Sequence, residues 1–312
     1  MNITIKSNLI FYYLFCLYLC FFDEPIEIHA SSAVSVSRDT AALARSYQKL
    51  SLSQYSQGMK LIQLLKIKPG EKILDIGCGT GELTAYSAQL CAPRGIVVGI
   101  DPSPYRIDLA RKKRIKYCSF QVASSDNLSA FPSNHFDVVY LNYVFHWIAD
   151  KKSVLKEIFR ILKPGGRLGI TMGDKQQNST VFAILMTSIK ETMGKIPYGE
   201  LVTPYYISKE QLLQLANQCG YSVDSLTVEE NIHYLNSPTE VIEFFEASDF
   251  GNFLGGIPQQ TKTKIIHKMK EKLAQISIPG RGIEMKYRTL IFVGHKPKNK
   301  SSPRPKLGFK NP

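Results

Sequence analysis

Cysteine is scarce in this chain of 312 residues, and its six copies follow no pattern of a disulfide framework or a metal site. Two of them lie in an apolar segment near the N-terminus, at positions 16 and 20. The other four show neither C-x-x-C spacing nor a tight cluster, and each sits in or beside an apolar stretch: Cys78, Cys91, Cys118 and Cys219. We therefore predict buried free thiols, with no disulfide and no metal, which favours a reducing compartment.

Acidic residues are also in deficit, because 26 Asp and Glu face 39 Lys and Arg and leave a formal net charge of +13. Such a balance permits binding to nucleic acid or to anionic lipid. The positive charges are scattered, however, apart from the run Lys112–Arg114 and a C-terminal tail without acids. We interpret the run as a solvated helix face and residues 297–312 as a disordered basic tail, so no nucleic-acid partner is expected.

A long apolar run occurs at the N-terminus, where residues 9–22 are all aliphatic, aromatic or cysteine and Asp23 ends the run. This length is too short to span a bilayer but suits the central region of a secretory signal. The small residue Ala30 follows at a suitable cleavage position. We predict that residues 1–30 are a signal peptide, that the protein is exported and that no membrane span remains after cleavage. The alternatives are an uncleaved surface anchor, or a cytoplasmic protein in which the segment is not used.

A buried strand, a glycine-rich turn and the start of a helix follow one another in ILDIGCGTGELT, residues 73–84. Gly77, Gly79 and Gly81 stand at every second position, which suits a sharp turn that a ligand approaches closely. The helix behind them offers free N–H groups to a polar or anionic ligand. The spacing is G-x-G-x-G after Asp75, whereas dinucleotide-binding proteins show G-x-G-x-x-G. An oxidoreductase is therefore disfavoured.

A second acidic residue, Asp101, ends the next apolar run, which begins at Gly95. In a strand-helix-strand unit this carboxylate lies at the carboxyl end of the neighbouring strand. There it can accept hydrogen bonds from both hydroxyls of a ribose. The glycine turn and Asp101 together predict a nucleoside-bearing ligand.

From Glu71 onward, apolar strands alternate with amphipathic helices. We predict strands over 72–76, 96–100, 119–122, 136–140 and 167–172, and helices near 82–91, 104–113 and 152–162. Near-continuous apolar strands between such helices indicate a parallel sheet that is covered on both faces. A ligand is then expected at the carboxyl ends of the strands.

The second half of the chain changes in character. Helices are predicted over 181–193, 239–247 and 259–275, and a capping box at Ser208–Gln211 starts a helix that ends at Gly220. Strands over 221–234 and 286–293 would close the sheet as an antiparallel pair. We predict one α/β domain over residues 44–296, with helical lid insertions at about 174–207 and 235–283.

The region before the glycine turn divides into two parts. Residues 31–43 are polar and are interpreted as a flexible leader, whereas residues 41–65 carry helical signals. In a single helix, Tyr47 and Gln54 would share one face because they are seven positions apart.

Four motifs in this order resemble the class I S-adenosylmethionine-dependent methyltransferases. They are the glycine turn ILDIGCGTGELT, the GID that ends at Asp101, the FDVVY strand and LKPGG, and the resemblance covers roughly residues 44–296. It implies a Rossmann-like fold, doubly wound, with a mostly parallel seven-stranded sheet and an antiparallel last strand. It also implies S-adenosyl-L-methionine as the cofactor.

A narrower likeness concerns the acceptor. Tyr47-x-x-x-Ser51-x-x-Gln54, together with His146-Trp147 after the fourth strand, looks like the small-acid carboxyl methyltransferases, the juvenile hormone acid and trans-aconitate group. The resemblance implies that Gln54 and Trp147 donate hydrogen bonds to a carboxylate, which is ionised at neutral pH and needs no general base. His146 could serve as a base for a hydroxyl or amine acceptor.

The resemblance also assigns the cofactor contacts. Asp75 and the three glycines would hold the amino-acid end, and Asp101 the ribose hydroxyls. Where the family reads the adenine with an Asp followed by a backbone N–H, this chain has a serine, with the nearest acid two positions later. The candidates for that contact and for the methionine part of the cofactor are Ser124, Ser125, Asp126 and Asn142.

Aromatic and aliphatic residues crowd the predicted lid, and only Arg281 and Arg288 carry a guanidinium in this half of the domain. The small-molecule acceptor is therefore predicted to be an apolar carboxylic acid rather than a polyacid. A protein or nucleic-acid methyltransferase would fit the basic charge, but an Asn-Pro-Pro-Tyr motif is absent after the fourth strand. A non-catalytic cofactor-binding module of the same fold is the remaining alternative. The oligomeric state stays open.

Overall fold

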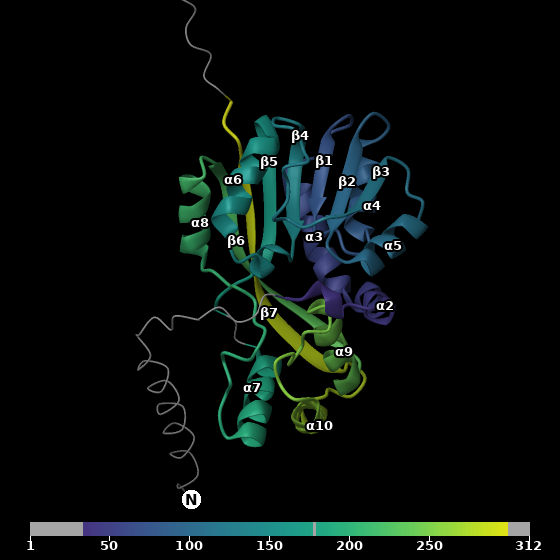
Figure 1. Ribbon diagram of the computed structural model, residues 1–312, viewed down its shortest axis with the longest axis vertical. Helices are drawn as coiled ribbons and strands as arrows, with labels where there is room; N and C mark the ends of the chain where they lie inside the picture. Colours follow the sequence, from purple (N-terminus) through teal and green to yellow (C-terminus); the bar gives the residue numbers. More distant parts are fainter. Residues whose placement is uncertain (1–33, 177–178, 299–312) are drawn as a thin grey trace, which may run out of the picture.

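The computed structural model describes residues 34–176 and 179–298 (Figure 1). The predicted signal peptide and nearly all of the predicted basic tail lie outside these ranges. Seven strands form one sheet in the order β3-β2-β1-β4-β5-β7-β6. Their bounds are Lys72–Ile76 for β1, Ile96–Asp101 for β2, Cys118–Val122 for β3, Phe136–Asn142 for β4, Leu162–Gly173 for β5, Ser222–Leu235 for β6 and Ile283–His295 for β7.

The predicted sheet is confirmed. Neighbouring strands from β3 to β5 are parallel, whereas β7 runs antiparallel to both β5 and β6. Successive side chains of a strand point to opposite faces. Leu74 and Ile76 of β1 accordingly pack on one face with α6 (Lys151–Ile161) and α8 (Lys209–Gln218). Ile73 packs on the other face with α3 (Leu52–Leu65) and α4 (Glu82–Cys91).

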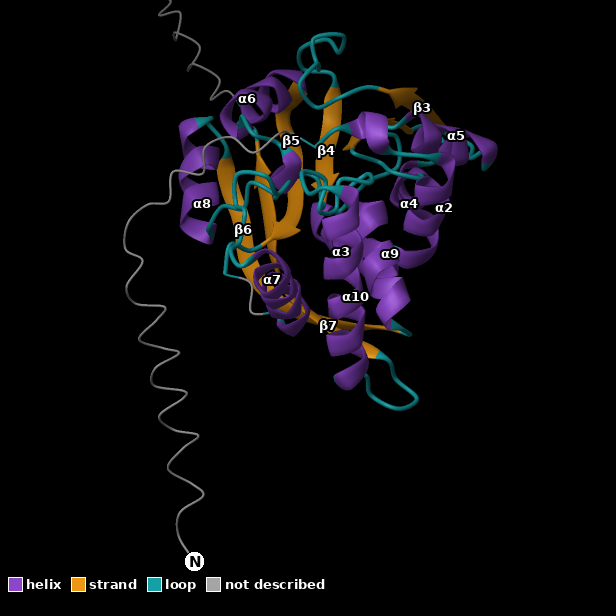
Figure 2. Cartoon of the chain, turned by 60° about the horizontal axis from the view of Figure 1, so that its bottom comes forward, coloured by secondary structure: helices purple, strands orange, loops and turns teal. Residues whose placement is uncertain are grey.

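A second apolar core lies beyond one end of the sheet. Strand β7 pairs with β5 only from Thr289 to His295, but with β6 along its whole length. The remaining part of this hairpin therefore extends past the sheet as an arm. Helices α7 (Thr180–Met193), α9 (Pro238–Ser248) and α10 (Gln259–Gln275) gather around it and bury Val181, Ile265 and Met269 (Figure 2). These helices are the lid.

Two features differ from the sequence expectation. The helical region 41–65 is two helices, α2 (Ala41–Leu50) and α3, because Ser51 leaves the helical conformation with ψ 19°. Serine competes for backbone hydrogen bonds and favours helix ends over helix interiors. Tyr47 and Gln54 therefore belong to different helices. The expected loop at 163–166 is part of β5.

The part of the expected leader that the structure describes is packed on the fold. The short helix η1 (Val36–Arg38) precedes α2, and Asp39 is 2% exposed. Helix α5 (Pro104–Lys112) provides the partner of Asp39. Over the described ranges, no helix combines the length and the apolar character needed to cross a membrane.

Candidate active site

A cavity of about 750 Å³ lies at the carboxyl ends of β1, β2 and β4, between the sheet and the lid. Nine of the residues singled out from the sequence line it, and they come from six separate segments. They are Gln54, Gly77, Asp101, Ser124, Ser125, Asp126, Asn142, His146 and Trp147. A second cavity of about 420 Å³, beside α2 and α4, contains none of them. The fold thus brings these nine residues to one place, whereas Asp75, Gly79 and Gly81 do not line the cavity.

The glycine turn follows β1 and leads into α4. Gly77, Gly79 and Gly81 have φ values of 75°, 55° and 85°, a left-handed conformation that favours glycine. The space around the turn is also restricted. A Cβ on Gly77 would overlap Cγ2 of Val144, and one on Gly81 would lie 2.9 Å from the ring of Phe120. Gly79 and Gly81 shape the turn without lining the cavity.

Asp75 has a different position from the one we expected. Its side chain is buried, with the residue 1% exposed, and does not line the cavity. Oδ2 accepts hydrogen bonds from Oγ1 of Thr84 at 2.6 Å and from the hydroxyl of Tyr140 at 2.9 Å. Burial raises the pKa of Asp75 to about 7. In this structure Asp75 joins β1 to α4 and β4, so it supports the glycine turn from behind.

Asp101, at the end of β2, lines the cavity as predicted by the strand-helix-strand pattern. Its Oδ2 accepts a hydrogen bond from N of Gly79 at 3.0 Å, and its Oδ1 accepts one from N of Ser103 at 2.9 Å. A carboxylate has about four acceptor sites, so two remain for a ligand. Desolvation raises the pKa of Asp101, and the positive charge of Arg106 opposes this shift.

These features fit the cofactor that the sequence resemblance implies. Gly77 lines the cavity without a side chain that would occupy it, and a carboxylate with unused acceptor sites faces the same space. Beside them, Ser124 and Asp126 form one small turn in which Oγ of Ser124 donates to Oδ2 of Asp126 at 3.2 Å. The turn presents a carboxylate and a hydroxyl to the cavity, and the sequence resemblance predicts the adenine contact at these residues.

Asn142, the last residue of β4, links this strand to α3 and to β5 by hydrogen bonds. Its Nδ2 donates to the carbonyl of Gln54 at 3.0 Å, and its Oδ1 accepts from Oγ1 of Thr171 at 2.6 Å. The next residue, Tyr143, has φ 57°, which is unusual for a bulky residue. Its hydroxyl and that of Thr289 lie 2.6 Å apart. Asn142 thereby fixes the backbone that carries Gln54.

His146 and Trp147 belong to the short helix η2 (Phe145–Trp147). The imidazole of His146 is packed between the rings of Trp147 and Tyr206, at centroid distances of 5.2 and 5.4 Å. Burial, and then the charge of Lys151, lower the pKa of His146 to about 3. His146 is therefore neutral at pH 7. Among the described residues, its Nδ1 and Oε1 of Gln54 are buried and have no hydrogen-bond partner.

The far wall of the cavity contains a histidine that no sequence motif predicted. His233 of β6 packs against the ring of Tyr287 at 5.4 Å and that of Phe244 at 5.9 Å. Within the described part of the chain, neither ring nitrogen of His233 has a partner, and burial lowers its pKa to about 4. No local motif marks His233, because its neighbours come from β7 and α9.

Positive charge in the cavity is mostly neutralised. Arg106 is paired with Asp39 at 3.2 Å, and Lys286 with Glu230 at 3.3 Å, while Lys175 is exposed. Across residues 34–176 and 179–298, no group of three or more His, Cys, Asp or Glu is placed to hold a metal ion. On the side of the lid, the wall of the cavity is mainly apolar and aromatic. It includes Phe182, Leu185 and Met186 of α7.

Comparison with known proteins agrees with this geometry. A family model described as a methyltransferase domain matches residues 74–170, from β1 to β5. A demethylmenaquinone methyltransferase of Lactobacillus johnsonii is 30% identical over 176 residues, which are 52% of this chain and 72% of that protein. A ubiquinone/menaquinone biosynthesis C-methyltransferase of Teredinibacter turnerae is 33% identical over 142 residues. The chain spans only 57% of that second relative.

A solved structure shares the fold. Phosphoethanolamine N-methyltransferase 2 of Haemonchus contortus, in complex with S-adenosyl-L-methionine, has a TM-score of 0.51 and 22% identity. The similarity covers 83% of this chain and 58% of that one. Neither relative nor this structure is named as a carboxyl methyltransferase, so the narrower likeness of the acceptor site stays a prediction.

Proposed function

Because the chain belongs to the class I S-adenosylmethionine-dependent methyltransferases, we propose that it methylates a small, largely apolar molecule held under its lid. The observation that carries this proposal is the cavity of about 750 Å³, whose lining passes from the glycine turn and Asp101 to the aromatic rings of the lid. Drug-sized ligands occupy cavities of this size. A macromolecular acceptor would require a more open site.

The bound cofactor supplies an activated methyl group on a sulfonium, and the protein supplies position and exclusion of water. Gln54, His146 and Trp147 line the acceptor half of the same cavity, and Asn142 fixes the backbone of Gln54 by a hydrogen bond. Proximity and alignment of this kind are worth on the order of 7 kcal/mol or more. The apolar walls keep water away from the acceptor.

We propose the carboxylate of an apolar acid as the first acceptor class. Gln54 and Trp147 each carry an N–H donor that an ionised carboxylate can use. The cavity offers no cluster of arginines among its described residues, which argues against a polyacid. An acid with a long apolar body would bury that body against α7 and α9.

A hydroxylated aromatic ring is the second candidate. His146 is neutral and its buried Nδ1 has no partner among the described residues, so it can accept a hydrogen bond from a ring hydroxyl. The aromatic wall formed by Tyr143, Tyr287 and Phe244 would pack against such a ring. The relatives named for demethylmenaquinone and ubiquinone also support this class.

An acceptor screen tests the proposal. The full chain, with methyl-labelled cofactor, is offered saturated medium- and long-chain acids, the matching alcohols, trans-aconitate and a naphthohydroquinone. We expect label in the esters of the longer acids and none in trans-aconitate. Transfer to the naphthohydroquinone alone would overturn the acid class in favour of the ring. Transfer to trans-aconitate in preference to both would overturn the apolar acceptor itself.

Variants of the two predicted donors separate acceptor binding from cofactor binding. We expect Gln54→Ala and Trp147→Phe to lower kcat/KM for the acceptor by about 10- to 100-fold, because a hydrogen bond to a charged group is worth about 1.5–3 kcal/mol. Cofactor affinity, measured by calorimetry with S-adenosylhomocysteine, should stay within about twofold. Gln63→Ala is the matched control, since Gln63 is exposed on the same helix. Equal losses in Gln54→Ala and Gln63→Ala would contradict the assignment.

A further inference from the structure

Two segments from distant parts of the sequence line the cavity without a role in the chemistry above. The first is residues 34–40, which we call the strap, and Val34 and Val36 contribute its lining side chains. The second is residues 247–255, the last two residues of α9 and the start of the connection to α10, which we call the lid loop. Asp249, Phe250 and Phe253 are among its lining side chains. The cofactor residues Gly77 and Asp101 face the same space.

The strap and the lid loop are joined by hydrogen bonds. N of Ser35 donates to Oδ1 of Asn252 at 3.3 Å, and Nδ2 of Asn252 donates to the carbonyl of Ser35 at 3.0 Å. Nη1 of Arg38 donates to the carbonyl of Gly255 at 2.9 Å. A Cβ on Gly251 would lie 2.8 Å from the carbonyl oxygen of Arg38. The two backbones therefore lie against each other, and glycine permits the approach.

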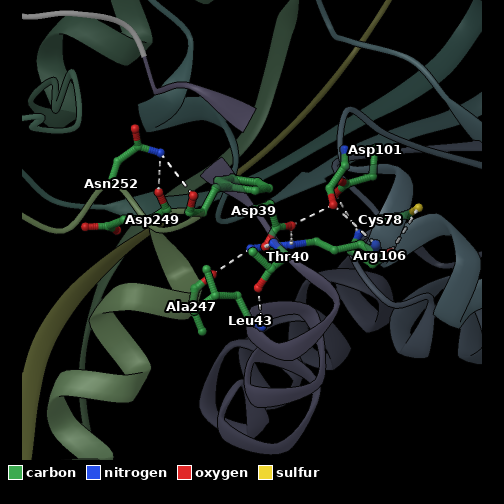
Figure 3. A network of polar contacts seen from close by, with 12 residues as sticks. Asp39, Thr40, Leu43, Cys78, Asp101, Arg106, Ala247, Asp249 and Asn252 are labelled. Carbon is green, nitrogen blue, oxygen red and sulfur yellow. Dashed lines mark hydrogen bonds and ion pairs between the residues drawn. The ribbon is translucent and has the colours of Figure 1, made fainter. Parts of the chain in front are cut away.

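One buried cation holds both segments. Arg106, in the first turn of α5, is 3% exposed. Its Nε donates to Oδ2 of Asp39 in the strap at 3.2 Å, and its Nη2 donates to the carbonyl of Ala247 in the lid loop at 2.6 Å (Figure 3). Oγ of Ser103 also donates to Asp39, at 2.6 Å. The ion pair is thus supported by further hydrogen bonds and enclosed.

Aromatic rings enclose the same guanidinium from two sides. Its central carbon lies 4.1 Å from the ring centroid of Tyr47 and 3.7 Å from that of Phe250. Phe250 has φ 54°, which is costly for a bulky residue and requires support from its surroundings. Tyr47 in turn abuts the glycine turn, since a Cβ on Gly79 would lie 3.1 Å from its Cε1. The contacts of Arg106 therefore extend to the cofactor cradle.

We infer that Arg106 is a positioning residue that holds the strap and the lid loop closed over the bound cofactor, so that cofactor release requires these contacts to open. Arg106 follows Asp101 by five positions, and Asp101 is bonded to Gly79. Arg106, which contacts both the strap and the lid loop, is therefore close in the chain to the residues proposed to hold the cofactor. This role rests on the proposed cofactor site and does not depend on which acceptor is methylated.

The test measures how fast labelled S-adenosylhomocysteine leaves the full chain when unlabelled ligand is added in excess. We expect Arg106→Gln and Asp39→Asn to raise the dissociation rate at least about tenfold, because each leaves a buried charge without its partner. Arg106→Lys keeps the positive charge but loses the planar guanidinium and its several N–H donors. Its dissociation rate should therefore lie between that of the wild type and those of the other two variants. The matched control is Arg160→Gln. Arg160 also pairs with a carboxylate, that of Glu157, and donates to backbone carbonyls, those of Leu128 and Phe131, but it lies outside the cavity.

Milder variants keep the test decisive if a buried substitution prevents folding. Arg38→Gln removes an exposed contact between strap and lid loop, and Gly251→Ala pushes the two apart. Both should raise the dissociation rate about threefold or more, Arg38→Gln through the loss of a single hydrogen bond and Gly251→Ala through steric overlap with the carbonyl of Arg38. If these variants and every folded Arg106 variant release the ligand at the rate of Arg160→Gln, while only thermal stability falls, Arg106 is a structural residue and the inference is overturned.

Discussion

Gly77→Ala is expected to weaken cofactor binding about 100-fold, although it removes no functional group. Gly77 has φ 75°, and an added Cβ would overlap Cγ2 of Val144. A left-handed residue with a side chain costs about 1–2 kcal/mol and overpacking about 1–3 kcal/mol. We expect the variant turn to relax away from this geometry in the free protein, so that regaining it on binding costs about 3 kcal/mol, which corresponds to the expected loss of affinity. Val144 leads directly into η2, so any relief would also move His146 and Trp147.

Calorimetry with S-adenosylhomocysteine measures this effect. Gly194→Ala is a matched control, because Gly194 also has a positive φ of 76° at the end of α7, but a Cβ added there would meet no atom within 4 Å. It should lose a little stability and keep its affinity. If Gly77→Ala binds within about threefold of the wild type, the packing of the glycine turn against Val144 does not determine the shape of the cofactor site.

The second large effect concerns pH. Burial lowers the pKa of His146 from 6.5 to about 3. Below pH 6.5, His146 binds a proton in the unfolded chain, whereas in the folded chain it stays neutral until the pH approaches 3. The free energy of unfolding therefore decreases as the pH falls. At about pH 5 this amounts to about 2 kcal/mol relative to about pH 7.5. His146→Phe cannot bind this proton. Between the two pH values, the free energy of unfolding of the wild type should therefore decrease by that amount relative to the variant.

Urea unfolding of both proteins between about pH 7.5 and about pH 5 tests the prediction. At each pH, the free energy of unfolding of the wild type must be subtracted from that of the variant, because Asp75 and Asp249 make stability change with pH in the opposite direction. Burial raises the pKa of each to about 7, so their contribution is present at low pH and is lost as the pH rises toward 7. Both carboxyls are common to the two proteins and cancel. A difference that stays constant with pH would show that the imidazole is not held neutral in the folded chain.

Several site features could be predicted from the sequence because they are local. Gly77, Gly79 and Gly81 adopt positive φ within a single turn, and Asp101 ends the strand that follows. The strands and helices from 72 to 173 follow from apolar periodicity, which acts over a few residues. The cofactor class is contained in this one stretch, which the family match also covers.

Other features depended on contacts that no local pattern records. The side chain of Asp75 points to Thr84 and Tyr140 because of the face it occupies in β1, not because of its place in the motif. Helices α2 and α3 are separated at Ser51, so Tyr47 and Gln54 do not share one helical face, yet both residues line the cavity. Packing around the cavity, rather than helical spacing, brings them together.

The sequence by itself therefore determined the sheet, the cofactor and the reaction class, since strand periodicity and a glycine turn are encoded by neighbouring residues. Only the tertiary structure decided the shape of the apolar side of the cavity and the contacts between the strap and the lid loop. His233 meets Tyr287 because β6 and β7 pair as a long hairpin, and Asp39 meets Arg106 although 67 positions separate them. Such contacts form when the whole chain packs, and their energy comes from burial that no single segment can achieve alone.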